Sequence, residues 1–281
     1  MRPLKIFGVI VVLVALAFAP VAVPRADAAP RSVSACIPVA TPAERAALAD
    51  LTDPSDIKTY QDAADKISEL RAALSKPNDY RGTFPIAFDE ILKLVGPSIK
   101  SGIYDDPVWA TNLAIEVVRL YVSALHDFVT GARPPAHWWQ ALRLTEQCDR
   151  SPGRVLMGQI FAHLIIDFPN ALVTVKSEPR HTRDFYTFGG ALVDATPAII
   201  AAFKRTYGVD LEPLFTAWFL GDIIGDQRAT TVLFQSTRTA AWVNNFGLQN
   251  PALHDATVAE MWVLYENATI FMNILEDLDQ I

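Results

Sequence analysis

The sequence predicts an all-α protein, in which a single domain of roughly eight to ten helices follows an extended N-terminal arm. Signals that start a helix, with Ser, Thr or Asp before Pro, recur along the chain. No segment shows the apolar–polar alternation of a β-strand between two turns. No internal repeat, low-complexity tract or long linker divides the chain. We therefore expect residues 41–281 to form one helical domain.

In the first half of this domain, three of the four expected helices have a residue that caps them. Thr41 and Glu44 form a capping box around Pro42 at the first helical position. Asp106-Pro107 opens the longest expected helix, which runs to about Thr130 and which Gly131 stops. Between these two, the expected helices are 55–76, capped by Ser55, and 83–95, interrupted by Gly96-Pro97.

The second half follows the same pattern. Pro134-Pro135 starts a helix that ends near Cys148, and Ser151-Pro152 starts the helix that carries His163. Pro197 predicts a kink in the next helix. That helix begins at Thr182 or Asp184 and ends at Gly208; the remaining expected helices run from Asp210 to Phe219, from Gln227 to Phe246 as one or two helices, and from about Asp255 to Asp279.

The N-terminus has the pattern of a secretory signal peptide. Arg2 and Lys5 precede an apolar run over residues 6–19, and Ala26-Asp27-Ala28 offers a cleavage signal. The apolar run is shorter than the roughly 20 residues of a membrane-spanning helix. We therefore expect residues 1–28 to be removed and residues 29–40 to form the extended arm. The mature protein is then secreted to the extracellular side, with no membrane span after signal cleavage.

The chain has two cysteines, Cys36 and Cys148. An exported protein with two cysteines is expected to join them in a disulfide, here between the arm and the end of a central helix. Lipidation of Cys36 is the alternative, because Val33-Ser34-Ala35-Cys36 resembles a lipobox; it would leave Cys148 without a partner.

Charge and missing motifs exclude several classes of function. A net charge of −7 is a poor match for the phosphates of nucleic acid, so we expect a small-molecule partner instead. The sequence has no P-loop, no G-x-S-x-G, no H-E-x-x-H and no C-x-x-C motif. These absences disfavour a classical serine hydrolase and a zincin.

His163 and Asp167 are the first candidate pair. Four residues apart on a helix, they share one face and can bind one ligand or each other. Apolar neighbours on all sides predict that both are buried, and a buried ionisable pair needs a partner such as a metal or a substrate. The alternative is a histidine bonded within the core, with Asp167 capping the helix that resumes after Pro169.

Two further groups lie later in the chain. Asp222 and Asp226 follow Trp218 and stand among glycines, where paired carboxylates can hold a divalent cation or act as acid and base; alternatively, Asp226 caps the next helix. Arg238, Trp242 and Asn245 share a helix face and offer a cation, an aromatic wall and an amide. The alternative for Arg238 is a structural ion pair with one of the aspartates.

Four passages together resemble an uncharacterised bacterial family of all-helical proteins, a domain of unknown function. The resemblance covers roughly residues 80–275 and implies an all-helical domain without an assigned reaction. It also implies that His163, Asp167, Arg238 and Trp242 belong to one site. The passages are Leu120-Tyr121-Val122-Ser123-Ala124-Leu125, Pro135-Ala136-His137-Trp138-Trp139, Ala162-His163-Leu164-Ile165-Ile166-Asp167-Phe168-Pro169 and Arg238-Thr239-Ala240-Ala241-Trp242-Val243-Asn244.

The succession His163, Asp167 and Pro169 is also similar to a metal-binding helix of the zinc-dependent phospholipase C and single-strand nuclease superfamily. This likeness implies that His163 and Asp167 bind zinc, which activates water for phosphoester hydrolysis. The chain departs from the superfamily where Asn170 follows Pro169 in place of a histidine, and where the mature chain begins without a tryptophan. At most one divalent metal such as zinc carries over.

Two hypotheses follow from different classes of function. In the first, the protein is a metal-dependent hydrolase of phosphoester type: His163 and Asp167 bind the metal, Asp222 or Asp226 completes the shell or serves as base, and Arg238 stabilises an anion. In the second, it is a non-catalytic helical bundle that holds an apolar or aromatic small molecule in a cavity lined by Trp and Phe. Trp218, Trp242 and Asn245 are the expected ligand-binding residues.

Overall fold

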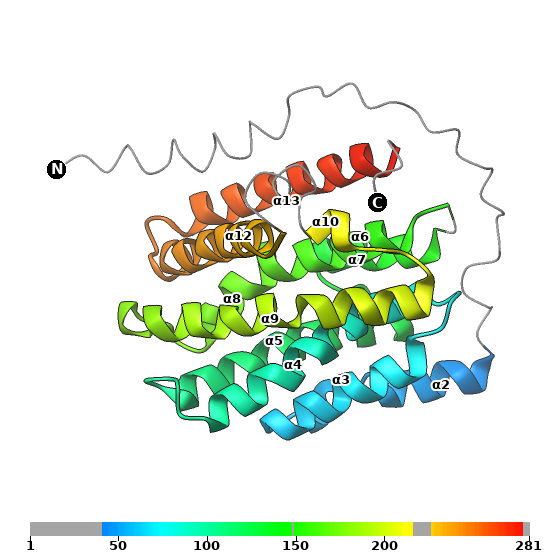
Figure 1. Cartoon of the computed structure of the whole chain (residues 1–281), viewed down its shortest axis with the longest axis horizontal. Coiled ribbons are helices and arrows are strands. Elements are labelled where there is room, and N and C mark those ends of the chain that lie inside the picture. Colours follow the sequence, from blue (N-terminus) through cyan, green and yellow to red (C-terminus); the bar gives the residue numbers. More distant parts are fainter. Residues whose placement is uncertain (1–40, 148, 216–225, 278–281) are drawn as a thin grey trace. The chain divides into compact units, whose positions relative to one another are not determined.

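The computed structural model describes residues 41–147, 149–215 and 226–277, apart from the side chains of 226–235. Within these ranges the chain is helical and contains no β-strand, which confirms the all-α prediction (Figure 1). The α-helices are α2 (Pro42–Leu51), α3 (Tyr60–Leu74), α4 (Thr83–Lys100), α5 (Pro107–Thr130), α6 (Ala136–Arg143), α7 (Pro152–Phe161), α8 (Phe168–Thr174), α9 (Thr182–Tyr207), α10 (Glu212–Phe215), α12 (Asp226–Gln249) and α13 (His254–Asp277).

Several helix ends lie at the residues that the sequence predicted. Thr41 and Glu44 form the capping box of α2, and Asp106 caps α5 by accepting a hydrogen bond from the backbone N–H of Trp109. Gly131 and Gly208 end α5 and α9 in the left-handed conformation, with φ of 84° and 73°. Glycine adopts this conformation without the steric penalty that other residues pay, which explains both stops.

Two boundaries differ from the prediction. The second helix begins at Tyr60 and not at Ser55, because Thr59 and Asp62 form a reciprocal capping box. In α4, Pro97 lies inside the helix and does not end it. Pro97 and Lys93 are both exposed, so the helical turn that lacks one hydrogen bond lies at the protein surface.

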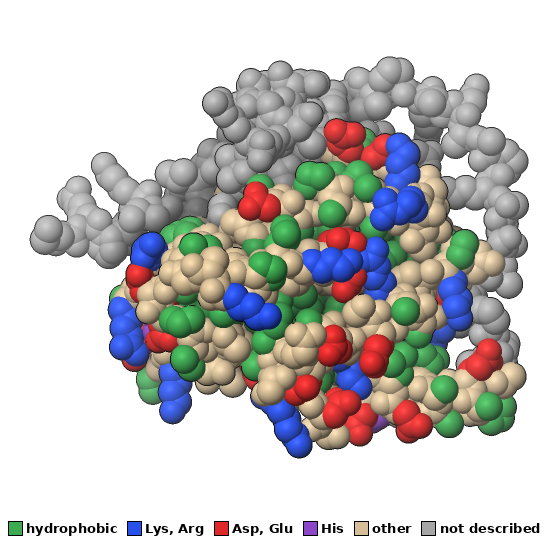
Figure 2. Space-filling view, turned by 60° about the horizontal axis from the view of Figure 1, so that its bottom comes forward, with side chains coloured by type: hydrophobic (Ala, Val, Ile, Leu, Met, Phe, Trp, Pro, Cys, Tyr) green, Lys and Arg blue, Asp and Glu red, His purple; other side chains and the backbone are tan. Residues whose placement is uncertain are grey.

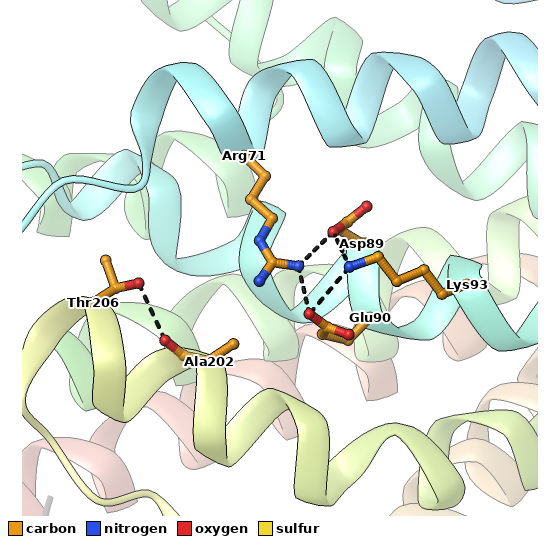
Figure 3. A network of polar contacts seen from close by, with 6 residues as sticks. All are labelled: Arg71, Asp89, Glu90, Lys93, Ala202 and Thr206. Atoms are coloured by element: carbon orange, nitrogen blue, oxygen red, sulfur yellow. Dashed lines mark hydrogen bonds and ion pairs between the residues drawn. The ribbon is translucent and has the colours of Figure 1, made fainter.

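The helices pack in a chain of neighbours (Figure 1). α3 packs on α4 and α5, α4 packs on α9, and α8 packs on α12, which in turn packs on α13. Arg71 of α3 is held by Asp89 and Glu90 of α4, and Lys93 bonds the same two carboxylates (Figure 3). This network fixes α4 on one side, and its other side faces α9.

Three helical stretches are long and apolar enough to cross a membrane by length and composition: Pro107–Thr130, Pro152–Thr174 and Pro179–Tyr207. In their most apolar windows, 61%, 89% and 50% of the residues are buried inside the protein. Packing between helices therefore accounts for much of their apolar composition. On the face shown in Figure 2, acidic and basic side chains are interspersed, without a large basic surface.

A π-helical segment, η4 (Ala162–Asp167), joins α7 to α8 without a break. The backbone N–H of Phe168 donates to the carbonyl of His163, five residues earlier. Pro169 gives the physical reason, because its ring crowds the carbonyl four residues earlier and it has no N–H to donate. Widening the turn relieves that contact, and the side-chain amide of Asn170 donates to the carbonyl of Ile166 at 2.7 Å. Such segments are frequent at functional sites.

Candidate ligand-binding cavity

A cavity of about 60 Å³ lies where α4, α9 and the η4 segment meet. Among the lining residues that the structure describes, His163 is the only one whose side chain carries a polar atom. The lining consists of Phe84, Ala87, Phe88, Ile91, Leu92, Val95, Val117, Ile160, His163, Leu164, Phe168, Phe188, Leu192, Ile199 and Phe215.

His163 is 8% exposed and lies among aromatic rings. Its ring centroid is 5.4 Å from that of Phe84, 5.3 Å from that of Phe88 and 6.2 Å from that of Phe168. Nδ1 is buried without a hydrogen-bond partner, and we find no hydrogen bond to Nε2 in the described part of the chain. Burial lowers the pKa of His163 to about 4, against the opposing effect of the Asp167 charge. At neutral pH the imidazole is therefore uncharged.

Asp167 bonds to α6 and not to His163. Its two carboxylate oxygens contact Nε2 of His137 at 2.7 Å and accept a hydrogen bond from Nε1 of Trp138 at 2.6 Å. The hydroxyl of Tyr265 donates to the carbonyl of His137 at 2.9 Å. Asp167, which lies in the η4 segment with His163, thus attaches α6 to the core.

Sequence reasoning missed His137 and Trp138. A signal was nevertheless present, because adjacent imidazole and indole groups at a helix start need a buried acceptor, and Asp167 was a buried carboxylate without an assigned donor.

The metal-site prediction for His163 and Asp167 finds no support in this geometry. The Asp167 oxygens are taken by His137 and Trp138, while His163 faces the apolar cavity. No group of three or more His, Cys, Asp or Glu side chains in the described ranges is arranged to hold a metal ion. The residues present therefore do not fit the zinc that the phospholipase C likeness implies.

Arg238 lies inside the protein, fully buried against aromatic rings. Its guanidinium carbon is 4.4 Å from the ring centroid of Phe185 and 5.5 Å from that of Phe168, and Nη2 donates to the carbonyl of Phe185 at 2.8 Å. Burial lowers its pKa to about 9, which still leaves it charged at neutral pH. The predicted role of stabilising a substrate anion does not fit this position, because the guanidinium has no exposed surface; instead it supports Phe168, which lines the cavity.

Trp242 and Asn245 lie on α12 with Arg238, on the face that the sequence predicted. The ring of Trp242 stacks on that of Phe185 at 4.6 Å. Asn245 donates to the backbone carbonyl of Trp242 and accepts from Gln249. Neither residue lines the cavity, so the predicted ligand-binding role becomes a packing role behind it.

The family follows from comparison with known proteins. Residues 60–269 match the model of a family described as "Family of unknown function (DUF5995)". The chain belongs to this family. The match spans every residue that lines the cavity, and it confirms the resemblance to an uncharacterised helical family. No curated protein and no solved structure matches the chain, so the phospholipase C likeness has no support there.

Several other residues that the sequence singled out are not among those that the structure describes. Trp218, Asp222, Cys36 and Cys148 fall outside the described residues. Asp226 is the first described residue of α12, and its side chain is not described, so its predicted roles stay predictions.

A second hollow, of about 180 Å³, lies between the start of α5 and the start of α9. It is lined by Asp105, Asp106, Arg180, His181 and Asp184. The two oxygens of Asp184 accept the backbone N–H groups of Asp105 and Asp106 at 2.8 and 2.7 Å. The His181 ring stacks on Trp109 at 4.9 Å. These side chains join two helix starts, so we regard this hollow as structural.

Proposed function

We propose that this protein is a non-catalytic helical binder, which takes a small, uncharged and mostly apolar molecule into the cavity beside His163. The observation that carries this proposal is a buried imidazole without a hydrogen-bond partner in an otherwise apolar chamber. The ligand would supply the missing partner through one polar group and fill the chamber with the rest of its surface.

Energetics support a ligand at this position. Leaving a buried donor or acceptor without a partner costs on the order of 1–3 kcal/mol. A leucine at position 163 would avoid that cost and fit the apolar surroundings. The imidazole therefore carries a stability cost that an apolar side chain would avoid, which is typical of functional sites.

The lining also favours binding over hydrolysis. General acid–base or nucleophilic catalysis needs a second group within hydrogen-bond reach of the reacting atoms. His163 is the one polar side chain among the described lining residues, and Asp167 is bonded on the side of α6. Because the imidazole is neutral at pH 7, a neutral ligand suits it better than a charged one.

We also propose that the protein acts outside the cytoplasm. This rests on the signal-peptide pattern over residues 1–28. An export assay that compares the full chain with one lacking residues 1–28 tests it. Accumulation of both chains in the cytoplasm would contradict the proposal.

Binding to His163 is tested with a panel of uncharged compounds that includes straight-chain alcohols, phenol and cyclohexanol. Isothermal titration calorimetry compares the wild type with His163→Leu, and with His254→Leu as a control for an exposed histidine. We expect the wild type and His254→Leu to bind at least one compound class, and His163→Leu to lose about tenfold in affinity, the value of one hydrogen bond. Binding that is equal in all three proteins, or absent from all, contradicts the proposal.

A further inference from the structure

Nine of the fifteen lining residues of the cavity lie on two helices, six on α4 and three on α9. On α4 they are spaced by three or four residues from Phe84 to Val95, and on α9 they run from Phe188 to Ile199. Eleven residues of helix cover about 16 Å at 1.5 Å per residue. α4 and α9 lie side by side over this length (Figure 1). The lining is therefore long in comparison with its small volume.

The free volume is too small for a compact ring. An engineered cavity of roughly 150 Å³ holds one benzene molecule, whereas this cavity has about 60 Å³. A narrow space along two helices fits a thin ligand better than a round one, and any ligand of useful size must also move the walls apart.

The α4–α9 boundary is built so that it can part. At one end, Asp184 of α9 accepts the N–H groups of Asp105 and Asp106, which follow α4. At the other end, the hydroxyl of Tyr207 donates to the carbonyl of Asp79, which precedes α4, at 2.9 Å. The start of α9 therefore lies near the end of α4, and the end of α9 near the start of α4, so the two helices run antiparallel.

Between those ends the contact is apolar. We find no hydrogen bond or ion pair from α4 to α9 among the described residues. Ile91 and Leu192, which line the space on either side, are partly exposed and mark its edge. Pro197 lies inside α9 and removes one backbone hydrogen bond, so the middle of α9 resists bending less than an unbroken helix does.

We infer that the ligand is an uncharged linear amphiphile: a single alkyl chain lies between α4 and α9, and its polar end group bonds His163. This inference rests on the proposed function and names its ligand class. His163 contacts Phe84 and Phe88, in the first part of α4, so the chain extends from there toward Val95 and Phe188. From Phe88 to Val95 the helix rises about 10 Å, which suits a chain of medium length.

A homologous series of straight-chain primary alcohols tests this class, measured by calorimetry on the purified mature protein. We expect the affinity to rise about fourfold per methylene, the value of burying one such group, until the chain reaches the end of the space and the gain stops. Cyclohexanol and phenol should bind much more weakly, and a straight-chain carboxylate more weakly than the alcohol of equal length.

A matched pair of variants tests where the alkyl chain of the ligand lies. Phe188→Leu shortens a side chain at the far end of the space and should move the limiting chain length upward. Phe203→Leu makes the same change on the same helix at a fully buried position that does not line the space, and should leave the limit unchanged. Their melting temperatures are measured beside the affinities, so that a general loss of stability is recognised by its equal effect on both.

The outcomes separate this inference from the proposed function. If compact rings bind through His163 and affinity does not rise with chain length, the linear ligand class is overturned while the proposed function stands. If the limit moves equally in both variants, the placement between α4 and α9 is overturned. If no compound binds, both the inference and the proposed function fail.

Discussion

Nδ1 of His163 is buried and has no hydrogen-bond partner among the described residues. Its pKa of about 4 in the folded protein is well below its ordinary value of 6.5. Below pH 6.5 the unfolded chain therefore binds a proton that the folded chain binds only near pH 4. Protonation of His163 therefore lowers the stability of the folded state as the pH falls from about 6.5 to about 4.

We expect His163→Leu to be more stable than the wild type at neutral pH, because it removes a buried group without a partner. The difference should widen by about 3 kcal/mol as the pH is lowered from 7 to 4, since only the wild type has this imidazole to protonate. Urea unfolding at several pH values measures it. A difference that is constant with pH would contradict the lowered pKa.

Gly189 makes room for Arg238 behind the cavity. A Cβ at position 189 would lie 1.4 Å from Nη1 of Arg238, whereas a Cβ at the neighbouring Gly190 meets nothing within 4 Å. The guanidinium is enclosed by Phe185 and Phe168, so it has little freedom to move away.

We expect Gly189→Ala to lower the free energy of unfolding by about 2–4 kcal/mol through this collision. Gly190→Ala is the matched control and should be neutral or stabilising by up to about 1 kcal/mol, because alanine is the better helix former. Thermal unfolding of both variants measures this. Equal melting temperatures would show that Arg238 is not held where we describe it.

At the scale of single elements, Asp167 attaches α6 to the η4 segment. Asp167→Asn leaves one amide oxygen to accept from Trp138, and its amide N–H group then meets Nε2 of His137, which donates to the carboxylate in the wild type and must change tautomer to accept. We expect a loss of about 2–3 kcal/mol in urea unfolding. Asp194→Asn, at an exposed position of α9, is the control and should change stability by less than about 0.5 kcal/mol. A similar effect of both changes would mean that the α6 contact adds nothing.

Helix ends were predictable where one local signal was decisive, and not where two competed. As expected, α5 begins after Asp106 and ends at Gly131, and α7 begins at Ser151-Pro152. Ser55 and Thr59 are both good caps, and the capping box with Asp62 decided in favour of Thr59. At Pro97 the helix continues through an exposed turn, and exposure is a tertiary property that the local sequence does not give.

The sequence predicted that the site residues are buried, but it did not predict which side chains contact one another. The apolar neighbours of His163 predicted its burial correctly. The i, i+4 spacing to Asp167 suggested a shared ligand. In the structure, however, the Asp167 carboxylate bonds His137 and Trp138 of another helix. Partners so distant along the chain cannot be read from local spacing.

At the scale of the whole molecule, the family match and the helical structure agree on an all-α domain without an assigned reaction. Export and the Cys36–Cys148 disulfide stay predictions, since both cysteines lie outside the described residues.

If the disulfide forms, Cys36→Ser should lower stability by about 4–5 kcal/mol, because a loop of about 100 residues is no longer closed. Intact-mass measurement with and without reductant checks the bond directly. A free thiol at both cysteines in exported protein would rule it out.

The central claim is that His163 offers its imidazole to a small uncharged ligand inside an apolar chamber. It is tested most directly by nuclear magnetic resonance of the ring nitrogens of isotope-labelled histidine, while octanol is titrated into the protein at neutral pH. We predict a neutral His163 ring whose nitrogen signals shift with octanol and saturate, while those of the exposed His254 stay unchanged. A His163 ring that is protonated at neutral pH, or whose signals do not move as octanol is added, would contradict the account.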